Sequence, residues 1–325
     1  MIKRAGADLG SRALQWEMAN EARMTPRLLL LGIDGGGTRC RGRLADPSGL
    51  VLGEGYAGPA NLRLGLEECL RQVQHCTALC LDHAGIPGQE GRIVACLALA
   101  GASEPTHLEM VKSRPLRFRR AVFATDAHAA CVGAHKGGDG GIVIAGTGSI
   151  GWALLGGRTH RVGGWGFPLS DEGSGAWIGR ETLRRVLWAQ DGLTGWSGLL
   201  KSVFQSFDSD AHKITDWAET ARPRDYAALA PTVFEHAGQG DVEACRLIDR
   251  AAKHIEALVS RLKALGTSRI SLMGGLAGKF DPFLSDRLRS SLVAPSGDAL
   301  SGALRLARAE ADRLGIVRPE KALHG

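Results

Sequence analysis

The stretch Leu28-Leu-Leu-Leu-Gly-Ile-Asp-Gly-Gly-Gly-Thr38 decides the fold of this chain. An apolar run, typical of a buried strand, leads into an acid, three glycines and a hydroxyl. Glycine lets the backbone turn sharply and approach a ligand closely because it has no Cβ, and the N–H groups of such a turn can point at phosphate oxygens. The stretch predicts a phosphate-binding turn at Gly36, Gly37 and Thr38. Asp34, at the end of the strand, is the candidate Mg²⁺ residue, directly or through a water molecule.

The residues after this turn indicate what kind of turn it is. Arg39-Cys-Arg-Gly-Arg-Leu-Ala45 carries no helical pattern, whereas a dinucleotide-binding fold or a P-loop would begin a helix here. The chain is therefore expected to return as a second strand, with the glycines at a hairpin tip. Alone, such a run is more often an ordinary hairpin turn, so its meaning depends on what recurs downstream.

Four later segments complete a pattern: a short strand that ends at Asp126 and opens a helix, two further strand-and-glycine loops, and a helix start rich in small residues. They are Ala121-Val-Phe-Ala-Thr-Asp-Ala-His-Ala-Ala130, Gly141-Ile-Val-Ile-Ala-Gly-Thr-Gly-Ser149, Arg269-Ile-Ser-Leu-Met-Gly-Gly-Leu-Ala-Gly278 and Ala294-Pro-Ser-Gly-Asp-Ala-Leu-Ser-Gly-Ala303. In this order the five segments resemble the phosphate 1, connect 1, phosphate 2, adenosine and connect 2 motifs of the actin/hexokinase/Hsp70 ATPase superfamily. The resemblance implies a two-domain α/β actin-like ATPase (ribonuclease H-like) fold, with the nucleotide and sugar in the inter-domain cleft.

One stretch narrows the family. Val162-Gly-Gly-Trp-Gly-Phe-Pro-Leu-Ser-Asp-Glu-Gly-Ser-Gly-Ala-Trp-Ile-Gly179 resembles the signature of N-acetylglucosamine kinases and bacterial glucosamine kinases, in the BadF/BadG/BcrA/BcrD-type ATPase group. Gly58-Pro-Ala-Asn61 is similar to the family's sugar-binding turn, and the resemblance spans about Arg27 to Ala307. It implies a kinase that uses ATP and Mg²⁺ to phosphorylate the 6-hydroxyl of N-acetylglucosamine. The alternatives are a glucosamine kinase, an ATPase activator of a 2-hydroxyacyl-CoA dehydratase, and a non-catalytic sugar- or nucleotide-sensing module.

The resemblance also assigns roles to residues. A sugar hydroxyl is a weak nucleophile, so a carboxylate must orient it and accept its proton; the remaining catalysis is positioning and charge neutralisation at the phosphoryl group. Asp126 is the candidate catalytic base and touches the substrate. The other candidate substrate ligands are Asn61, Ser149, Gly164, Trp165 and Asp171, and the candidate ATP contacts beyond the first turn are Gly146, Thr147, Gly148, Gly274 and Gly275.

Several of these residues have a structural alternative. Asp126 could be the N-cap of the helix that follows it, Trp165 could pack in the core, and Glu172 could cap the helix from Ser174. The loop at Gly274 could be an ordinary tight turn. Separately, Leu97-Ala-Leu-Ala-Gly-Ala-Ser103 replaces a segment that is serine-rich in mammalian N-acetylglucosamine kinases, which keeps free glucosamine open as the substrate.

The pattern of apolar runs predicts the organisation. Residues 1–26 form an N-terminal extension, of which 1–23 are expected to be dispensable because Met24 offers a compact start. An N-terminal ATPase domain spans 27–136 and a C-terminal one spans 137–325, with a helical insertion over about 174–265 and a last helix that is a candidate to pack back on the first domain. Strands are predicted at Leu28–Ile33, Cys40–Ala45, Val51–Gly55, Ile93–Leu99, Ala121–Ala124, Ile142–Ala145, Ile150–Leu155 and Ile270–Met273.

The composition limits the classes of partner that the protein is expected to bind. The formal charge of +6 is modest, and lysines and arginines are scattered except for the run Arg114–Arg120. This run is expected to be a solvated edge, so no nucleic-acid partner is expected. The seven cysteines contain no Cys-x-x-Cys pair, which favours buried thiols in a reducing cytoplasm over an iron–sulfur cluster or structural zinc. No stretch is apolar enough to span a membrane. The expected partner is a small amino sugar, and a homodimer is one option for the oligomeric state.

Overall fold

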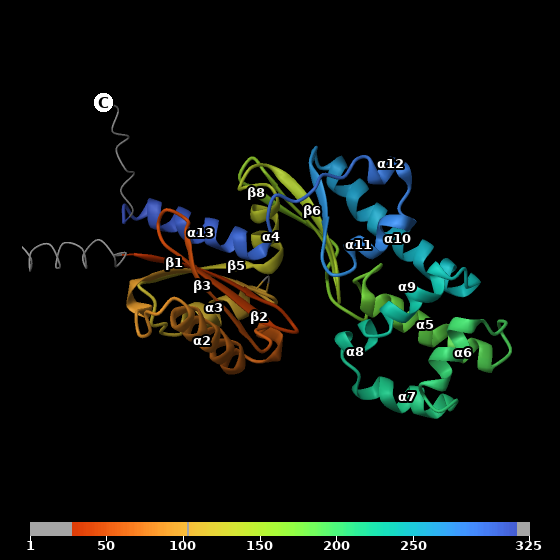
Figure 1. Cartoon of the computed structure of the whole chain (residues 1–325). Helices are drawn as coiled ribbons and strands as arrows, with labels where there is room; N and C mark the ends of the chain where they lie inside the picture. Colours follow the sequence, from red (N-terminus) through yellow and green to blue (C-terminus); the bar gives the residue numbers. More distant parts are fainter. Residues whose placement is uncertain (1–27, 103, 317–325) are drawn as a thin grey trace, which may run out of the picture. The chain divides into compact units, whose positions relative to one another are not determined.

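The computed structural model describes residues 28–102 and 104–316, and these form two compact units (Figure 1). The first unit holds the described parts of 1–35, 39–123 and 303–325, and the second holds 36–38 and 124–302. The predicted extension over 1–26 and the proposed start at Met24 lie outside the described residues. The domain limits expected from the sequence remain predictions.

The first unit is built on a mixed sheet with the strand order β3-β2-β1-β4-β5. The strands are β1 (Leu29–Gly35), β2 (Cys40–Ala45), β3 (Val51–Ala57), β4 (Ile93–Leu99) and β5 (Arg120–Thr125). β1 to β3 are antiparallel neighbours joined by hairpins, and β4 lies parallel to β1. A parallel neighbour needs a crossover, and helix α2 (Leu66–His83) provides it. The predicted strands of this unit are observed, with ends shifted by at most two residues.

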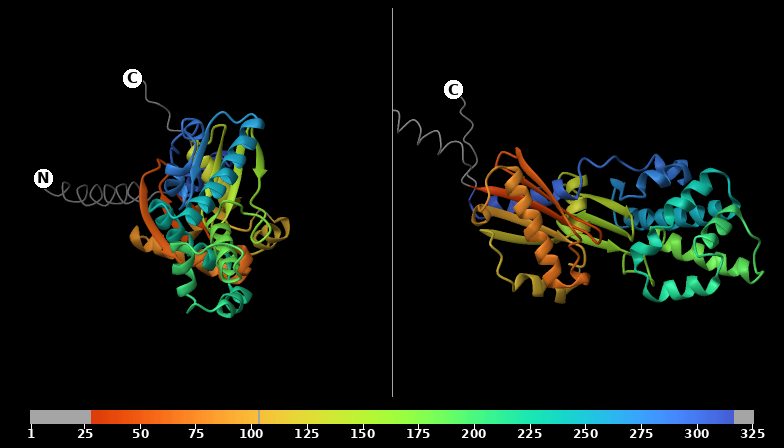
Figure 2. Two further views of the ribbon diagram at one scale, coloured as in Figure 1. Left: turned by 90° about the vertical axis from the view of Figure 1, so that its right-hand side faces the viewer. Right: turned by 60° about the horizontal axis from the view of Figure 1, so that its bottom comes forward.

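Both faces of β1 are buried, which explains its unbroken leucine run. Leu29 and Leu31 pack in the core cluster that includes α2. Leu28 and Leu30 pack in a second cluster with Ala311 of helix α13 (Ala299–Arg313). The views in Figures 1 and 2 show α2 and the C-terminal part of α13 on opposite faces of this sheet. Helix α3 (Pro105–Lys112) lies between β4 and β5 in the chain.

The cysteines of α2 face the core. Cys69, Cys76 and Cys80 are all buried, as the helical spacing predicts. Burial raises the pKa of the Cys69 thiol to about 11. All seven cysteines are free, and only Cys245 is partly exposed. These thiols therefore behave as small apolar side chains that fill the core.

The second unit repeats the strand order on a smaller scale. Its sheet runs β8-β7-β6-β9, formed by β6 (Gly140–Ala145), β7 (Ser149–Leu155), β8 (Arg158–Val162) and β9 (Ile270–Met273). β6 to β8 are antiparallel and β9 lies parallel to β6. The sequence did not predict β8, because Arg-Thr-His-Arg-Val lacks an apolar alternation at this sheet edge.

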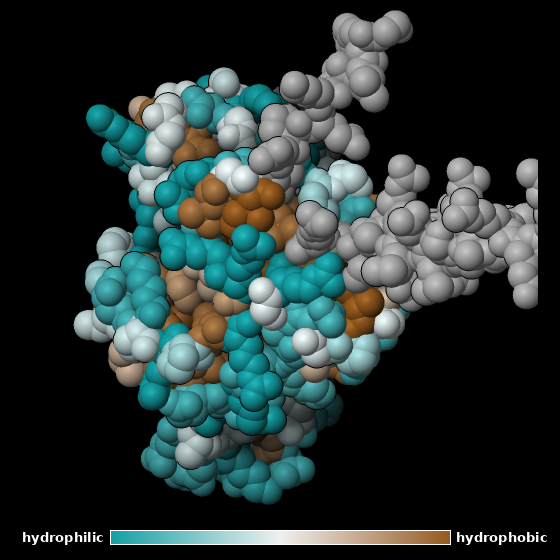
Figure 3. All heavy atoms as spheres, turned by 90° about the vertical axis from the view of Figure 1, so that its left-hand side faces the viewer, coloured by the Kyte–Doolittle hydropathy of each residue, from teal (hydrophilic) through white to brown (hydrophobic). Residues whose placement is uncertain are grey.

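Helices fill the interval between β8 and β9, as predicted. They are α5 (Gly175–Gln190), α6 (Gly198–Gln205), α7 (Ala211–Thr220), α8 (Pro223–Ala227), α9 (Ala230–Gly238) and α10 (Val242–Ala264), with α11 (Ala277–Phe280) and α12 (Asp286–Arg289) after β9. Their apolar faces and the sheet form one large core. Among the described residues, no helix is both long and apolar enough to cross a bilayer. The face drawn in Figure 3 is mostly hydrophilic, with hydrophobic residues in small separate patches.

Two glycines, Gly302 in α13 and Gly133 in α4, allow these two helices to pack closely. A Cβ on Gly302 would lie 1.8 Å from the carbonyl oxygen of Ala129 in helix α4 (Asp126–Ala134). A Cβ on Gly133 would lie 2.0 Å from the carbonyl oxygen of Asp298. Since neither clash can be relieved by a side-chain rotation, the two helices can cross at this distance only with glycine at both positions.

An ion-pair cluster ties α13 to β5 within the first unit and makes a prediction about pH. Glu310 is buried and accepts from Arg313 at 2.8 Å and from Arg120 at 2.8 Å. The hydrogen bonds from Arg313, then those from Arg120, lower the pKa of Glu310 from 4.5 to about 2. A depressed carboxyl pKa contributes stability above the unfolded-state pKa, and this contribution is lost as the pH falls through the folded-state value.

We therefore expect Glu310→Gln to lower the free energy of unfolding at pH 7 by roughly 1–2 kcal/mol, after allowance for solvent screening of the half-exposed arginines. The difference from wild type should shrink as the pH falls from 4.5 to about 2. Urea unfolding at several pH values measures it, with the exposed Glu219→Gln as the control. A difference that stays constant from pH 7 to pH 3 would contradict this assignment.

Candidate functional site

The first glycine turn is the tip of the β1–β2 hairpin. The last strand pair is Gly35 with Cys40, so residues 36–39 form the loop. Gly37 and Thr38 are exposed and Gly36 is partly exposed. The backbone of this turn is therefore accessible to a ligand, as expected for a phosphate-binding turn.

Asp34 is paired across the hairpin with an arginine. The strand register sets it opposite Arg41, whose Nη2 and Nε donate to Asp34 Oδ2 at 2.6 Å and 3.1 Å. One carboxylate oxygen is thus already engaged. In residues 28–102 and 104–316 no three or more acids, histidines and cysteines form a metal cluster. Mg²⁺ binds proteins through one or two carboxylates plus phosphate oxygens and waters, so Asp34 fits a site completed by a nucleotide.

Asn61 lies beside the carboxyl ends of β1 and β4. The Ala100 N–H donates to Gly35 O at 2.8 Å, and the Leu62 N–H donates to Ala100 O at 3.0 Å. Asn61 Oδ1 accepts from the Arg63 N–H at 2.9 Å and so caps a short 3₁₀ turn. This bond fixes the orientation of the Asn61 side-chain amide. The amide lies near Gly35, the residue before the first glycine turn.

Asp126 begins α4, but it is not the residue that caps the helix. Thr125 is the N-cap, because its Oγ1 accepts from the His128 N–H at 3.0 Å. The N-cap alternative for Asp126 is therefore wrong, and the sequence could not distinguish two adjacent residues that both cap well. Asp126 Oδ1 instead accepts from the Ala127 N–H at 2.8 Å. In the first turn, the helix dipole stabilises its negative charge.

The second glycine loop is held against the start of α5. The carbonyl oxygens of Gly146 and Thr147 accept from the N–H groups of Gly175 and Ala176 at 2.8 Å and 3.1 Å. Ser149 Oγ donates to Glu172 O at 2.7 Å. The first N–H groups of α5 are therefore used by the loop, and the loop is fixed where it connects β6 to β7.

Asp171 lies directly over this loop. A Cβ on Gly148 would lie 2.9 Å from Asp171 Oδ2, so a side chain at position 148 would displace the carboxylate. The φ angle of Asp171 is 68°, which is uncommon for a residue with a side chain and costs on the order of 1–3 kcal/mol. The structure thus brings Gly148, Ser149 and Asp171 together, although strands β7 and β8 lie between the loop and Asp171 in the chain.

Trp165 is on the surface. Its side chain is 73% exposed, so the core-packing alternative is wrong. The Arg161 guanidinium lies 4.1 Å from the centre of the indole ring and donates to the carbonyl oxygens of Gly163 and Gly164. Arg161 was missed by the sequence reasoning, because its role depends on the unpredicted strand β8.

The alternative in which Glu172 caps α5 is also wrong. Ser174 Oγ accepts from the Trp177 N–H at 3.2 Å and is the N-cap. Glu172 is exposed and does not cap this helix. Its backbone carbonyl, rather than its carboxylate, is what contacts the site, through Ser149.

The third glycine loop combines a structural and an open position. Gly274 has φ 98°, and a Cβ there would lie 2.3 Å from Ala145 O. The Leu276 N–H donates to the same oxygen at 3.0 Å. Gly275 has open space where a side chain would stand. The tight-turn alternative therefore explains Gly274, whereas packing does not require glycine at 275.

Within each unit, several of the predicted site residues lie close together. In the first unit Asp34 and Asn61 lie near the end of β1. In the second unit Gly146–Ser149, Asp171 and Gly274 share one end of the sheet. The carboxyl ends of the central strands carry both groups, where open α/β sheets generally bind ligands.

Comparison with known proteins identifies the relatives of this arrangement. The model of the BadF/BadG/BcrA/BcrD ATPase family matches residues 31–299. A glucosamine kinase from Vibrio cholerae is 41% identical over 280 residues, covering 85% of this chain and 95% of the relative. These matches confirm the family resemblance predicted from the sequence.

Two solved structures show the same fold. A candidate N-acetylglucosamine kinase from Chromobacterium violaceum has a TM-score of 0.83 at 34% identity, covering 87% of this chain and all of that chain. A ROK family glucokinase from Streptomyces griseus, solved with glucose and AMPPNP, has a TM-score of 0.55 at 17% identity, covering 88% and 99%. The predicted two-domain actin-like α/β fold class is confirmed.

The contrast between Gly274 and Gly275 predicts two different results for one kind of substitution. Gly274→Ala places a methyl group against a backbone carbonyl at a positive φ, so we expect it to lower the free energy of unfolding by about 1–3 kcal/mol. Gly275→Ala enters open space and should change it by less than about 0.5 kcal/mol. Urea unfolding of the two variants measures both changes in the free energy of unfolding. Equal losses would refute the packing requirement for glycine at position 274.

Proposed function

Because this chain belongs to the BadF/BadG/BcrA/BcrD ATPase family, we propose that it is an ATP-dependent amino-sugar kinase that phosphorylates the 6-hydroxyl of its substrate. The observation that carries the proposal is the position of Asp171 against Gly148. A carboxylate that can accept from sugar hydroxyls is held directly on the loop expected to bind the phosphates. A sugar ligand and a phosphate ligand are then neighbours in one rigid element.

The phosphoryl donor is assigned to the glycine loops. Backbone N–H groups of Gly36, Gly37 and Thr38 would approach the β- and γ-phosphates, and those of the loop at Gly146–Gly148 would oppose them, with Gly274 and Gly275 beside the adenosine. Fixed N–H donors of this kind stabilise charge that builds up in the transition state. Mg²⁺, held by Asp34 or its water shell, would supply further neutralisation of the phosphates.

The transfer itself needs one proton acceptor. The sugar 6-oxygen attacks the γ-phosphorus, its proton passes to an Asp126 carboxylate oxygen, and the bond to the ADP oxygen breaks. Thr125 provides the helix cap, so Asp126 is not needed for that purpose. Its place in the first turn of α4 keeps it fixed relative to the backbone.

Sugar recognition is assigned to five residues besides Asp126. Asn61 and Asp171 offer an amide and a carboxylate to adjacent hydroxyls, and Gly164 lets the backbone come close to the ring. Trp165 presents an exposed indole that Arg161 braces from one side. The Ser149 hydroxyl donates to a backbone carbonyl, so toward the sugar it would act as an acceptor.

Between the two amino sugars, we propose glucosamine as the preferred acceptor and N-acetylglucosamine as the second. The Vibrio cholerae relative at 41% identity is a glucosamine kinase. In this chain Leu97, Leu99 and Ala102 are buried apolar residues, so none of these three side chains can donate a hydrogen bond to an acetamido oxygen. A cytoplasmic location remains a prediction.

The acceptor and the position of transfer are tested together. ADP release from Mg-ATP is measured with glucosamine, N-acetylglucosamine, glucose and no sugar, and the product's phosphorylated carbon is assigned by NMR. We expect release that depends on an amino sugar, fastest with glucosamine, and a phosphate on carbon 6. Equal release without sugar would favour the dehydratase-activator type of ATPase, and phosphate at another carbon would refute the 6-kinase assignment.

The base assignment gives a separate prediction. Asp126→Asn keeps the size of the side chain but removes the proton acceptor, so we expect kcat to fall by about 10²–10⁴-fold. ATP affinity should change by less than about twofold, because Asp126 is not assigned to the nucleotide. The exposed Asp82→Asn is the matched control. If Asp126→Asn retained activity within about threefold, a barrier change of only ~0.7 kcal/mol, Asp126 would not be the base.

A further inference from the structure

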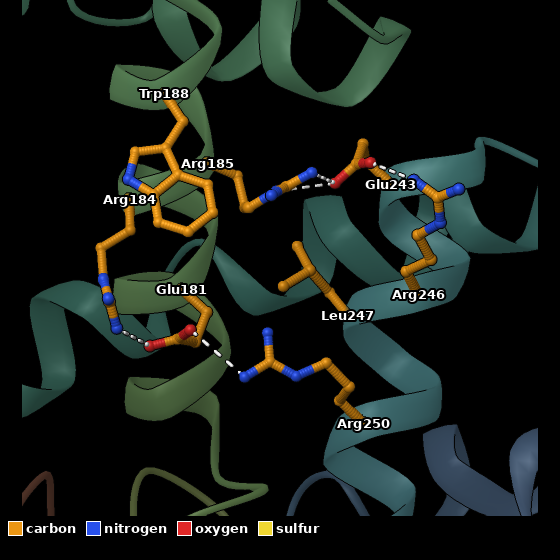
Figure 4. Close-up of a pocket in the computed structure, with 8 residues that line it drawn as sticks. All are labelled: Glu181, Arg184, Arg185, Trp188, Glu243, Arg246, Leu247 and Arg250. Carbon is orange, nitrogen blue, oxygen red and sulfur yellow. Dashed lines mark hydrogen bonds and ion pairs between the residues drawn. The ribbon is translucent and has the colours of Figure 1, made fainter. Parts of the chain in front are cut away.

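A cavity of about 310 Å³ opens between α5 and α10, entirely within the second unit (Figure 4). Its walls are contributed by one face of each helix. The lining residues are Glu181, Arg184, Arg185, Trp188, Glu243, Arg246, Leu247 and Arg250. None of them belongs to the candidate active site described above.

The charges of this cavity do not cancel. Four arginines stand against two glutamates, a formal excess of two positive charges. Glu243 is shared by Arg185 and Arg246, each at 2.8 Å. Glu181 is likewise shared by Arg184 at 3.1 Å and Arg250 at 3.5 Å. Figure 4 shows both glutamates between arginines of the cavity wall. Since arginine stays charged in proteins, the excess persists at any physiological pH.

The arginines keep donors available for a ligand. Arg184, Arg246 and Arg250 are 57%, 66% and 52% exposed, and each makes its ion pair in the cavity through one nitrogen. A guanidinium has five N–H donors in a planar fork. That geometry matches the oxygens of a phosphate group in a bidentate contact. The arrangement can therefore bind an anion without breaking the pairs to the buried glutamates.

The two other lining residues are uncharged and come one from each helix, Trp188 from α5 and Leu247 from α10 (Figure 4). Trp188 is 42% exposed, and the Arg185 guanidinium lies 5.2 Å from the centre of its ring. Leu247 lines the cavity from α10. An indole face and an aliphatic side chain suit a small ring better than an extended chain, and the volume is at the lower end of the range for small-molecule sites, about 300–1,000 Å³.

We propose that this cavity is a second ligand site, for a small phosphomonoester carried on a ring, of the hexose phosphate class. A phosphomonoester carries about −1.5 to −2 charges at pH 7, which matches the excess of the arginines. The phosphate contacts Arg184 and Arg250, which flank Glu181 (Figure 4), and the ring lies against Trp188. A purely structural ion-pair network between two helices would not need the cavity.

The site is connected to the turn that carries Asp171. α5 begins directly after that turn. On α10, the residue after Arg250 is Ala251, and a Cβ on Gly173 would lie 2.7 Å from the Ala251 carbonyl oxygen. A ligand that holds Arg184 and Arg250 together thus acts on both helices that support the turn. This regulatory consequence, unlike the binding site, rests on the proposed kinase function.

Binding is tested by calorimetry on the full chain with glucose 6-phosphate, inorganic phosphate and glucose. We expect glucose 6-phosphate to bind, phosphate to bind at least tenfold more weakly, and glucose to give no heat. In R184Q/R250Q the dissociation constant for glucose 6-phosphate should rise at least tenfold. Arg261→Gln, an exposed position on the same helix, should leave it within twofold.

Several outcomes would overturn the site. They are the absence of heat when glucose 6-phosphate is added to wild type, an unchanged dissociation constant in the double variant, or an equal loss of affinity in Arg261→Gln. Equal affinity for inorganic phosphate would refute the ring contact with Trp188. Thermal unfolding of each variant checks folding, and the single variants R184Q and R250Q replace the double variant if its midpoint falls.

The regulatory part has its own readout. Saturating glucose 6-phosphate should change the KM for the amino sugar at least twofold in wild type and in Arg261→Gln, but not in R184Q/R250Q. Binding without any change in KM would overturn the regulatory role and leave the site standing. A chain without kinase activity would refute the proposed function, and calorimetry would still decide the site.

Discussion

The second unit depends on the attachment of its glycine loop to the start of α5. Two backbone hydrogen bonds from Gly175 and Ala176, and the Ser149 hydroxyl bond to Glu172, fix the β6–β7 loop on the turn before the helix. The carbonyl oxygens of the loop are thereby satisfied internally. The same attachment positions the Asp171 carboxylate over Gly148. These bonds hold the loop in one conformation relative to the start of α5.

Each sheet places its glycine turn at the same topological point. In both units a hairpin follows the first strand, and a later strand joins parallel to it. The hairpin tip and the carboxyl end of the parallel strand are then neighbours. In the second unit Gly274 follows β9 and packs on Ala145, the last residue of β6. The close contact at this point is what demands glycine, and it leaves Gly275 beside open space.

Two clusters in which arginines surround buried carboxylates differ in their surroundings. In the first unit, Arg120 and Arg313 surround one buried carboxylate, Glu310, and the cluster holds α13 against β5. Between α5 and α10, arginines outnumber the buried carboxylates and line a cavity. The ratio of arginines to carboxylates is two to one in both clusters; the first holds two elements of the fold together, whereas the cavity beside the second leaves room for an anionic ligand.

The sequence by itself determined every strand except β8, the family and the glycine turns, because these depend on local signals. The leucine run of β1 is apolar at every position, and the glycines after it favour a turn. The tertiary structure alone decided which neighbour caps α4, since Thr125 and Asp126 are equally suitable by type. It also exposed Trp165, which its aromatic character would place in the core, and revealed β8, whose polar residues carry no strand pattern. The cavity joins residues of α5 and α10 that the intervening helices separate in the chain. Contacts over such distances follow from packing, which no local pattern encodes.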